Sequence, residues 1–172
     1  MSTISAEKIL SQAEVICQQR SVRLTPQRLE VLRLMTEHNG AISAYDLLDL
    51  LRASEPQAKP PTIYRALDFL LEQGFIHRVE STNSYVVCHH FEEPSHASAM
   101  LICDRCGSVT EQHADGVEDI LKKLVLKSGF ALVHSVIEAH GFCQRCQEIE
   151  DCTHRDICDH DHSVQSVRKR SR

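Results

Sequence analysis

Two pairs of cysteines with metal-ligand spacing are the residues in this sequence best suited to chemistry. They are Cys103 with Cys106 and Cys143 with Cys146, and two residues separate the members of each pair. This spacing lets both sulfur atoms of a pair face one point, and two pairs supply the four thiolates of a tetrahedral structural zinc site. Two disulfides, or four buried thiols, are the alternatives. No secretory signal is recognisable, so we expect a reducing, cytoplasmic compartment in which disulfides are rare.

Histidine and cysteine are abundant and unevenly distributed along the 172 residues. The chain has 8 Cys and 11 His, and all but Cys17 and His38 lie at or beyond His77. The net charge of −5 excludes a strongly basic, non-specific nucleic-acid binder. No apolar run approaches the roughly 18 residues of a membrane span. Metal chemistry is therefore expected in the second half and at its junction with the first.

Four helices are predicted in the first half from apolar periodicity and capping residues. The first covers residues 4–20, and the second begins at Pro26 and is stopped by Asn39 and Gly40. The third is capped by Ser43 and extends to Leu51, and the fourth extends from about residue 60 to Gly74. In the fourth helix, Thr62, Tyr64 and Arg65 lie outside the apolar stripe. This is the end that a recognition helix inserts into a major groove, where Arg65 could bind a guanine edge. Tyr45 and Lys59 are further candidate DNA contacts; ordinary solvated side chains are the alternative for each.

Two strands around a four-residue loop follow the fourth helix. They span residues 75–80 and 85–88, and the loop is 81–84. Helices followed by a hairpin predict a winged helix-turn-helix. Counting outward from the loop pairs His77 with Cys88 across the strands, at a distance from which both could bind one metal. An ordinary cross-strand pair without metal is the alternative.

A small α/β domain is predicted after a polar connecting segment that ends near His96. A strand over 99–103 leads into the first cysteine pair, and a second strand returns from it and brings Glu111 back toward His96. A helix over 117–127 follows, and a long alternating strand over 130–140 then leads to the second cysteine pair. An open sheet of this kind suits pairing with a second copy of the chain. The tail beyond is polar, and its ligands between Cys152 and His162 could bind a third metal or be adventitious.

Three sequence motifs resemble the ferric uptake regulator family of bacterial metal-sensing repressors. They are Thr25-Pro26-Gln27-Arg28, Pro61-Thr62-Ile63-Tyr64-Arg65-Ala66-Leu67 and the paired cysteine motifs, and the resemblance extends from about Ile4 to Cys146. It implies an α+β fold with a winged helix-turn-helix DNA-binding domain (1–88), a hinge (89–97) and an α/β dimerisation domain with structural zinc (98–150), to which the polar composition adds a flexible tail (151–172). It also implies a homodimer that binds near-palindromic operator DNA.

A second metal site follows from the same resemblance. His77, Cys88, His96 and Glu111 match the regulatory site of the zinc-sensing branch of the family. Iron-sensing members usually carry alternating histidines before the first cysteine pair, and this chain has Cys88-His89-His90 instead. One thiolate, two imidazoles and one carboxylate form a borderline-soft set that suits zinc better than manganese. The sequence leaves open whether His89, His90 or His113 binds any metal.

The predicted function is a zinc-responsive transcriptional repressor of zinc-uptake genes, with two zinc ions per subunit and no enzymatic activity. The regulatory ion would fix the angle between the DNA-binding and dimerisation domains. An iron, manganese or peroxide sensor of the same family is one alternative. A zinc hydrolase, with Glu111 as base and the other three residues as ligands, is a second, and a zinc-binding adaptor without DNA binding is a third.

Overall fold

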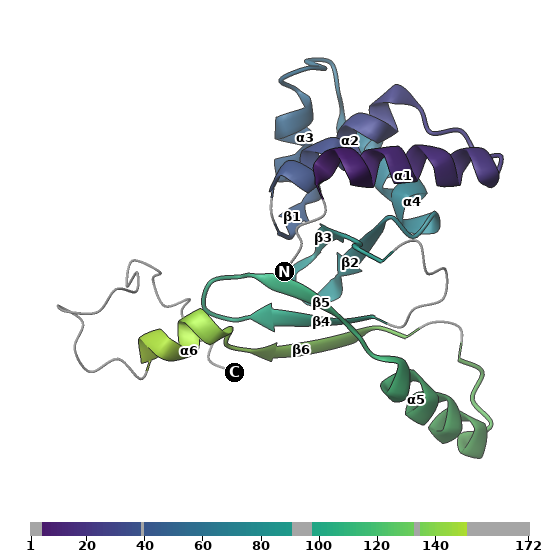
Figure 1. The fold of residues 1–172 in the computed structure, drawn as a ribbon, viewed down its shortest axis with the longest axis vertical. Helices are drawn as coiled ribbons and strands as arrows, with labels where there is room; N and C mark the ends of the chain where they lie inside the picture. The colour runs from purple at the N-terminus through teal and green to yellow at the C-terminus, as the bar shows by residue number, and fades with distance from the viewer. Residues whose placement is uncertain (1–4, 39, 91–97, 133–134, 151–172) are drawn as a thin grey trace. The chain divides into compact units, whose positions relative to one another are not determined.

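The chain divides into two compact units, Met1–His96 and Ala97–Arg172. The computed structural model describes residues 5–38, 40–90, 98–132 and 135–150, and Figure 1 shows the elements of each unit. Among these residues, no helix combines the length and apolarity that crossing a membrane requires.

The four predicted helices of the first unit are present, and local capping explains where they begin. They are α1 (Ala6–Gln19), α2 (Pro26–His38), α3 (Ala44–Leu51) and α4 (Pro60–Glu72). The hydroxyl of Thr25 accepts the backbone N–H of Arg28 at 3.3 Å, and the hydroxyl of Ser43 accepts that of Asp46 at 3.1 Å. Each bond satisfies a donor that the first helical turn leaves unpaired. Helix α4 ends before Gly74, whose φ of 76° lies in the left-handed region that glycine adopts without strain.

The helices of the first unit pack around one apolar core. Fully buried side chains from α2, α3 and α4 meet Phe75 and Ile76 at the start of the hairpin. Each buried leucine or isoleucine contributes about 1.5–3 kcal/mol relative to an exposed one. The core includes Phe69, which the predicted apolar stripe of the fourth helix omitted. Phe69 is 8% exposed, and the guanidinium of Arg28 lies over its ring, 3.9 Å from the ring centroid.

The hairpin of the first unit is present, but its predicted register is wrong by two residues. Strand β2 (Ile76–Val79) is antiparallel to β3 (Ser84–Val87), and His77 is opposite Val86 rather than Cys88. The loop begins one residue earlier than predicted, because a 3₁₀ turn (Glu80–Thr82) is followed by Asn83 in the left-handed conformation, with φ 48°. A two-residue strand, β1 (Ile42–Ser43), was not predicted; it pairs with β3, giving the order β1-β3-β2.

The second unit is a three-stranded sheet with two helices. Its elements are β4 (Ser98–Cys103), β5 (Val109–His113), α5 (Asp115–Ser128), β6 (Ile137–Gly141) and α6 (Gln144–Glu150), and the strand order is β5-β4-β6. Strand β5 is antiparallel to β4, and β6 is parallel to it after the crossover through α5. The long strand predicted over 130–140 is wrong at 130–132 and 135–136, which are described but are not in a strand. Helix α6 was not predicted.

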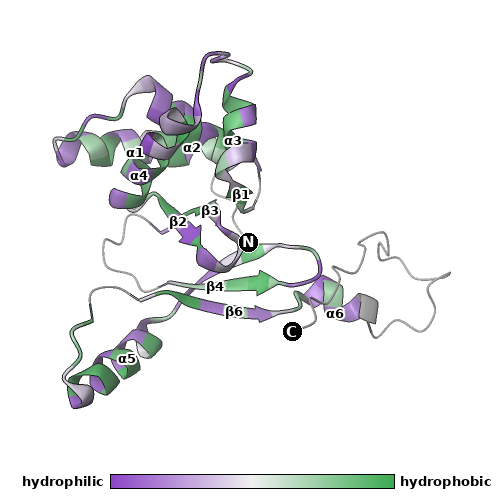
Figure 2. Ribbon diagram, turned by 180° about the vertical axis from the view of Figure 1, so that it is seen from behind, coloured by the Kyte–Doolittle hydropathy of each residue, from purple (hydrophilic) through white to green (hydrophobic). Residues whose placement is uncertain are grey.

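Helix α5 has an apolar face without a core to cover it in the single chain. None of its residues is buried, and Val117, Ile120 and Leu124 are 43%, 58% and 57% exposed. Figure 2 shows the hydrophobic residues along this helix. An amphipathic helix is stable mainly when its apolar face is packed. This face is therefore suited to contact with a second copy of the chain.

Candidate metal centres

The four cysteines come together at one end of the sheet of the second unit. Cys103 ends β4, Cys106 closes the turn that follows, and Cys143 and Cys146 flank the start of α6. The parallel pairing of β4 and β6 aligns Cys103 with Gly141, so both cysteine pairs leave the sheet at the same edge. The backbone N–H of Asp104 donates to the carbonyl of Gly141 at 2.8 Å and fixes this alignment.

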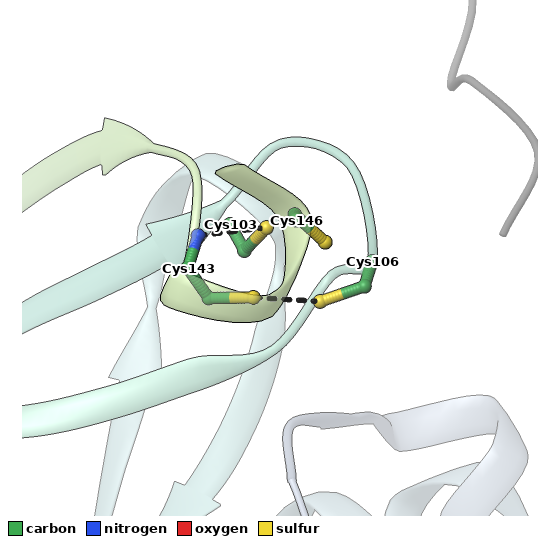
Figure 3. Close-up of side chains that lie close together, drawn as sticks. All are labelled: Cys103, Cys106, Cys143 and Cys146. Atoms are coloured by element: carbon green, nitrogen blue, oxygen red, sulfur yellow. Dashed lines mark hydrogen bonds between the residues drawn. The ribbon is translucent and has the colours of Figure 1, made fainter. Parts of the chain in front are cut away.

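The geometry of the four sulfur atoms fits a tetrahedral zinc ion. All four lie within 4.8 Å of one another, and the sulfur atoms of Cys106 and Cys143 are 3.8 Å apart (Figure 3). Zinc–sulfur bonds of about 2.3 Å imply a sulfur–sulfur edge of about 3.8 Å in a regular tetrahedron. A disulfide would require about 2.05 Å, and the cysteines are free thiols in this structure. The predicted ligand set is therefore brought together, and its donor chemistry suits zinc.

Hydrogen bonds prepare part of the cluster for negative charge. The hydroxyl of Ser108, 3.2 Å from the sulfur of Cys106, lowers the pKa of that thiol to about 6. Burial acts to raise the pKa of Cys103, but backbone N–H groups, including that of Cys143 at 3.3 Å from its sulfur, outweigh burial and lower it. Burial and the neighbouring sulfur atoms raise the pKa of Cys146 to about 12. Four thiolates this close need a cation to ionise together, which a divalent ion supplies.

His77 and Cys88, the candidate regulatory ligands of the first unit, are close together despite the register error. A ring nitrogen of His77 and the sulfur of Cys88 lie within 4.8 Å of each other. The shift of two residues makes them diagonal neighbours on one face instead of direct partners. Cys88 is fully buried, its backbone N–H donates to the carbonyl of Phe75, and its sulfur accepts the backbone N–H of His90 at 3.3 Å. An N–H group aimed at sulfur favours a thiolate.

The other candidate regulatory ligands belong to other parts of the chain. Glu111 lies on β5 in the second unit, where its carboxylate accepts the hydroxyl of Ser98 at 2.5 Å. His96 and the tail ligands from Cys152 to His162 lie outside the described residues. The side chains of His89, His90 and His113 remain without an assigned role.

The candidate DNA contacts lie on or next to two helices of the first unit, and all but Thr62 are exposed. Tyr45 on α3 is 68% exposed and Tyr64 on α4 is 40% exposed; Lys59 and Arg65 are also exposed. The hydroxyl of Thr62 is partly engaged, since it accepts the backbone N–H of Lys59 at 3.5 Å. The guanidinium of Arg65 makes no hydrogen bond or ion pair with any residue that the structure describes. It is therefore available to a ligand of the α4 N-terminus.

Comparison with known proteins was made on the whole chain. The model of the ferric uptake regulator family matches residues 19–140. The chain belongs to the ferric uptake regulator family. Within this family it is 68% identical to the zinc uptake regulation protein of Escherichia coli (strain K12), over 98% of this chain and 99% of that protein. It is 26% identical to the peroxide operon regulator of Bacillus subtilis, over 83% and 96% of the two chains.

Solved structures of family members agree with the fold. One is a zinc uptake regulator complexed with zinc and DNA, which is 69% identical and has a TM-score of 0.84; the match covers 87% of this chain and 100% of that chain. Another is holo XcZur, which is 39% identical with a TM-score of 0.77, covering 83% and 99%. The predicted family and the α+β fold class, a winged helix-turn-helix with an α/β dimerisation domain, are confirmed.

Proposed function

We propose that this protein is a zinc-responsive transcriptional repressor that binds operator DNA as a zinc-loaded homodimer and represses zinc-uptake genes. The supporting observation is 69% identity, over the full length of the solved chain, to a zinc uptake regulator complexed with zinc and DNA. A regulator of this family is not an enzyme, and no catalytic residues are assigned. We place the protein in the cytoplasm, where operator DNA is.

The proposal includes two zinc ions per subunit with different roles. The ion at Cys103, Cys106, Cys143 and Cys146 is structural, since four thiolates leave no open coordination position. The second ion is regulatory, with His77 and Cys88 from the hairpin, His96 from the connecting segment and Glu111 from β5 as ligands. This mixed set of sulfur, nitrogen and oxygen suits zinc better than manganese, which prefers oxygen.

Regulation follows from which parts of the chain carry the second ligand set. The ligands belong to the DNA-binding domain (1–88), the hinge (89–97) and the dimerisation domain (98–150), so one ion would limit the motion of one domain against the other. Two recognition helices held about 34–36 Å apart fit successive major grooves of a near-palindromic operator. Zinc acts in this way only if it binds the fixed arrangement more tightly than the mobile one.

The recognition surface is proposed to be the exposed side of the α4 N-terminus with Tyr45 beside it. Arg65 would read a guanine edge, whereas Lys59, Thr62, Tyr64 and Tyr45 would contact phosphates or sugars. The net charge of −5 does not oppose this, because phosphate contacts depend on the local surface.

Metal content and operator binding, measured on the same sample, test the proposal. Elemental analysis should give two zinc ions per subunit, one of which a mild chelator removes. Removal should release a labelled palindromic operator, and zinc should restore binding at lower free concentration than iron or manganese. Equal operator binding with and without the chelator would refute a zinc-responsive repressor. Restoration by iron or manganese in preference to zinc would assign the protein to another metal.

A further inference from the structure

The two cysteine motifs carry an arginine at the same place, but only one of these arginines contacts the other motif. Arg105 precedes Cys106 and Arg145 precedes Cys146. The guanidinium of Arg105 donates to the carbonyl oxygen of Cys146 at 2.7 Å and lies 5.1 Å from the ring centroid of Phe142. Arg145 is exposed on α6 and makes no hydrogen bond or ion pair within the described part of the chain.

The contacts of Arg105 enclose the second cysteine pair. Phe142 precedes Cys143, and the carbonyl that accepts the hydrogen bond belongs to Cys146, so one side chain contacts the ring of the residue before the pair and the backbone of the last residue of the pair. An arginine can make both contacts at once, because the N–H groups of its planar guanidinium donate hydrogen bonds within the plane while the face of the guanidinium stacks on an aromatic ring.

Asp104 adds a second link between the motifs that also needs no metal. Its carboxylate accepts a hydrogen bond from Nδ1 of His140 at 2.9 Å, and its backbone N–H donates to the carbonyl of Gly141. The two residues between Cys103 and Cys106 therefore hold the end of β6 and the start of α6, which carry the second pair.

We propose that Arg105 is a positioning residue of the four-cysteine zinc site, which keeps the second cysteine pair next to the first and thereby slows the loss of zinc. This rests on the proposed structural zinc. Zinc leaves such a site when one pair of thiolates separates from the other. A link between the backbones of the two pairs holds a released thiolate within reach of the ion, so rebinding competes with escape. The positive charge of Arg105 also lies beside a site whose four thiolates and one zinc ion carry a net charge of −2.

The rate of zinc transfer to a chelator tests this role, with Arg145 as the matched control. Zinc-loaded wild type, Arg105→Gln, Arg145→Gln and Arg105→Lys are mixed with excess 4-(2-pyridylazo)resorcinol, and the slow phase of colour development is followed. We expect zinc loss roughly three- to tenfold faster in Arg105→Gln, the range for the net loss of one hydrogen bond. Arg145→Gln should match the wild type, and Arg105→Lys should be intermediate because lysine keeps the charge but cannot stack while donating.

Two results would overturn the positioning role. Equal acceleration in Arg105→Gln and Arg145→Gln would mean that positive charge, rather than the contact, slows zinc loss. An unchanged rate in Arg105→Gln would mean that the contact does not hold the pairs together. If Arg105→Gln does not fold, Arg105→Lys takes its place, because lysine cannot donate to the carbonyl of Cys146 and stack on Phe142 at the same time, and a wild-type rate in that variant also refutes the role.

Amide hydrogen exchange of the zinc-free protein gives a readout that does not depend on the ion. Residues 141–146 should exchange faster in Arg105→Gln than in Arg145→Gln, since the link is proposed to act without metal. Equal exchange would overturn that part of the proposal. Failure of the proposed structural zinc site would look different, because the wild-type protein would then contain no tightly held zinc.

Discussion

Replacing Cys88 by serine should abolish the response to zinc while leaving the fold intact. The side chain of Cys88 is fully buried, and its sulfur accepts the backbone N–H of His90. Serine has nearly the same shape, and its oxygen can accept the same N–H group, so we expect a loss of about 1–2 kcal/mol in the free energy of unfolding. A serine hydroxyl is not ionised at neutral pH, however, and cannot replace a thiolate ligand.

The effect on regulation should be much larger than the effect on stability. Loss of a partner that only orients a metal ligand costs 10- to 100-fold in affinity, as an order of magnitude. Loss of the ligand itself should exceed that. A full switch between free and operator-bound states needs about 10⁴-fold preference of zinc for the binding-competent state. The variant should therefore show nearly the same weak operator affinity with and without zinc, and by linkage operator DNA should no longer tighten its zinc binding.

Cys17 provides the control, because it is also a buried thiol in the core of the first unit, with 2% exposure. Operator binding is measured by fluorescence anisotropy in zinc-buffered solution for the wild type, Cys88→Ser and Cys17→Ser, and stability by urea denaturation. Cys17→Ser should lose a similar amount of stability and keep the zinc response. A wild-type zinc midpoint in Cys88→Ser, or an equal loss of response in both variants, would refute the regulatory role of Cys88.

Three further predictions address the dimer, the DNA contact and the pH dependence. Ile120→Glu should convert the dimer to a folded monomer in sedimentation, with dimer affinity reduced at least about 100-fold because a charge would be buried unpaired; Lys123→Glu, on the same helix, should remain dimeric. Arg65→Ala should weaken specific operator binding roughly 5- to 150-fold and relax base preference at one position, as competition with substituted operators would reveal. The hydrogen bond from Arg33 lowers the pKa of Glu30 in the folded protein. The contact therefore stabilises the fold at pH values above about 4.3, the pKa of glutamate in the unfolded chain. Its contribution is lost as the pH falls through the lower pKa of the folded state. Glu30→Gln should therefore cost about 0.5–1 kcal/mol at pH 7 by urea denaturation, with a shrinking difference in acid; a difference independent of pH would contradict the ion pair.

Local signals predicted those features of the chain that depend on neighbouring residues. The spacing of the cysteine pairs predicted a four-sulfur cluster, and Ser43 and Thr25 predicted where two helices begin, because a metal motif and a cap each involve only a few consecutive residues. The hairpin register was missed, although asparagine is a residue type that adopts the left-handed conformation readily, and Asn83 could have marked the end of the loop. The error was two residues, which preserves the alternation of side chains, so His77 and Cys88 still share a face.

Features that depend on distant contacts were not predicted. An alternating pattern over 130–140 shows that a segment could pair as a strand, but it does not show which strand is available. Among the described residues of this segment, the part from Ile137 onward is paired, with β4 as its partner. Phe69 belongs to the core and also contacts Arg28, which is far from it in sequence. The different roles of Arg105 and Arg145 could not be seen in two motifs of the same pattern, because only the fold brings Arg105 next to Phe142.

The crossover from β4 through α5 to β6 starts at one cysteine pair and ends at the other. A metal ion that joins both pairs therefore closes a ring of about 40 residues, which in a polymer model reduces the entropy of the unfolded chain by an amount worth about 4 kcal/mol. This contribution varies only with the logarithm of ring size, so adding one helical turn to α5 would change it by about 0.1 kcal/mol. Helix α5 can therefore be longer or shorter in related proteins at almost no thermodynamic expense to the metal closure.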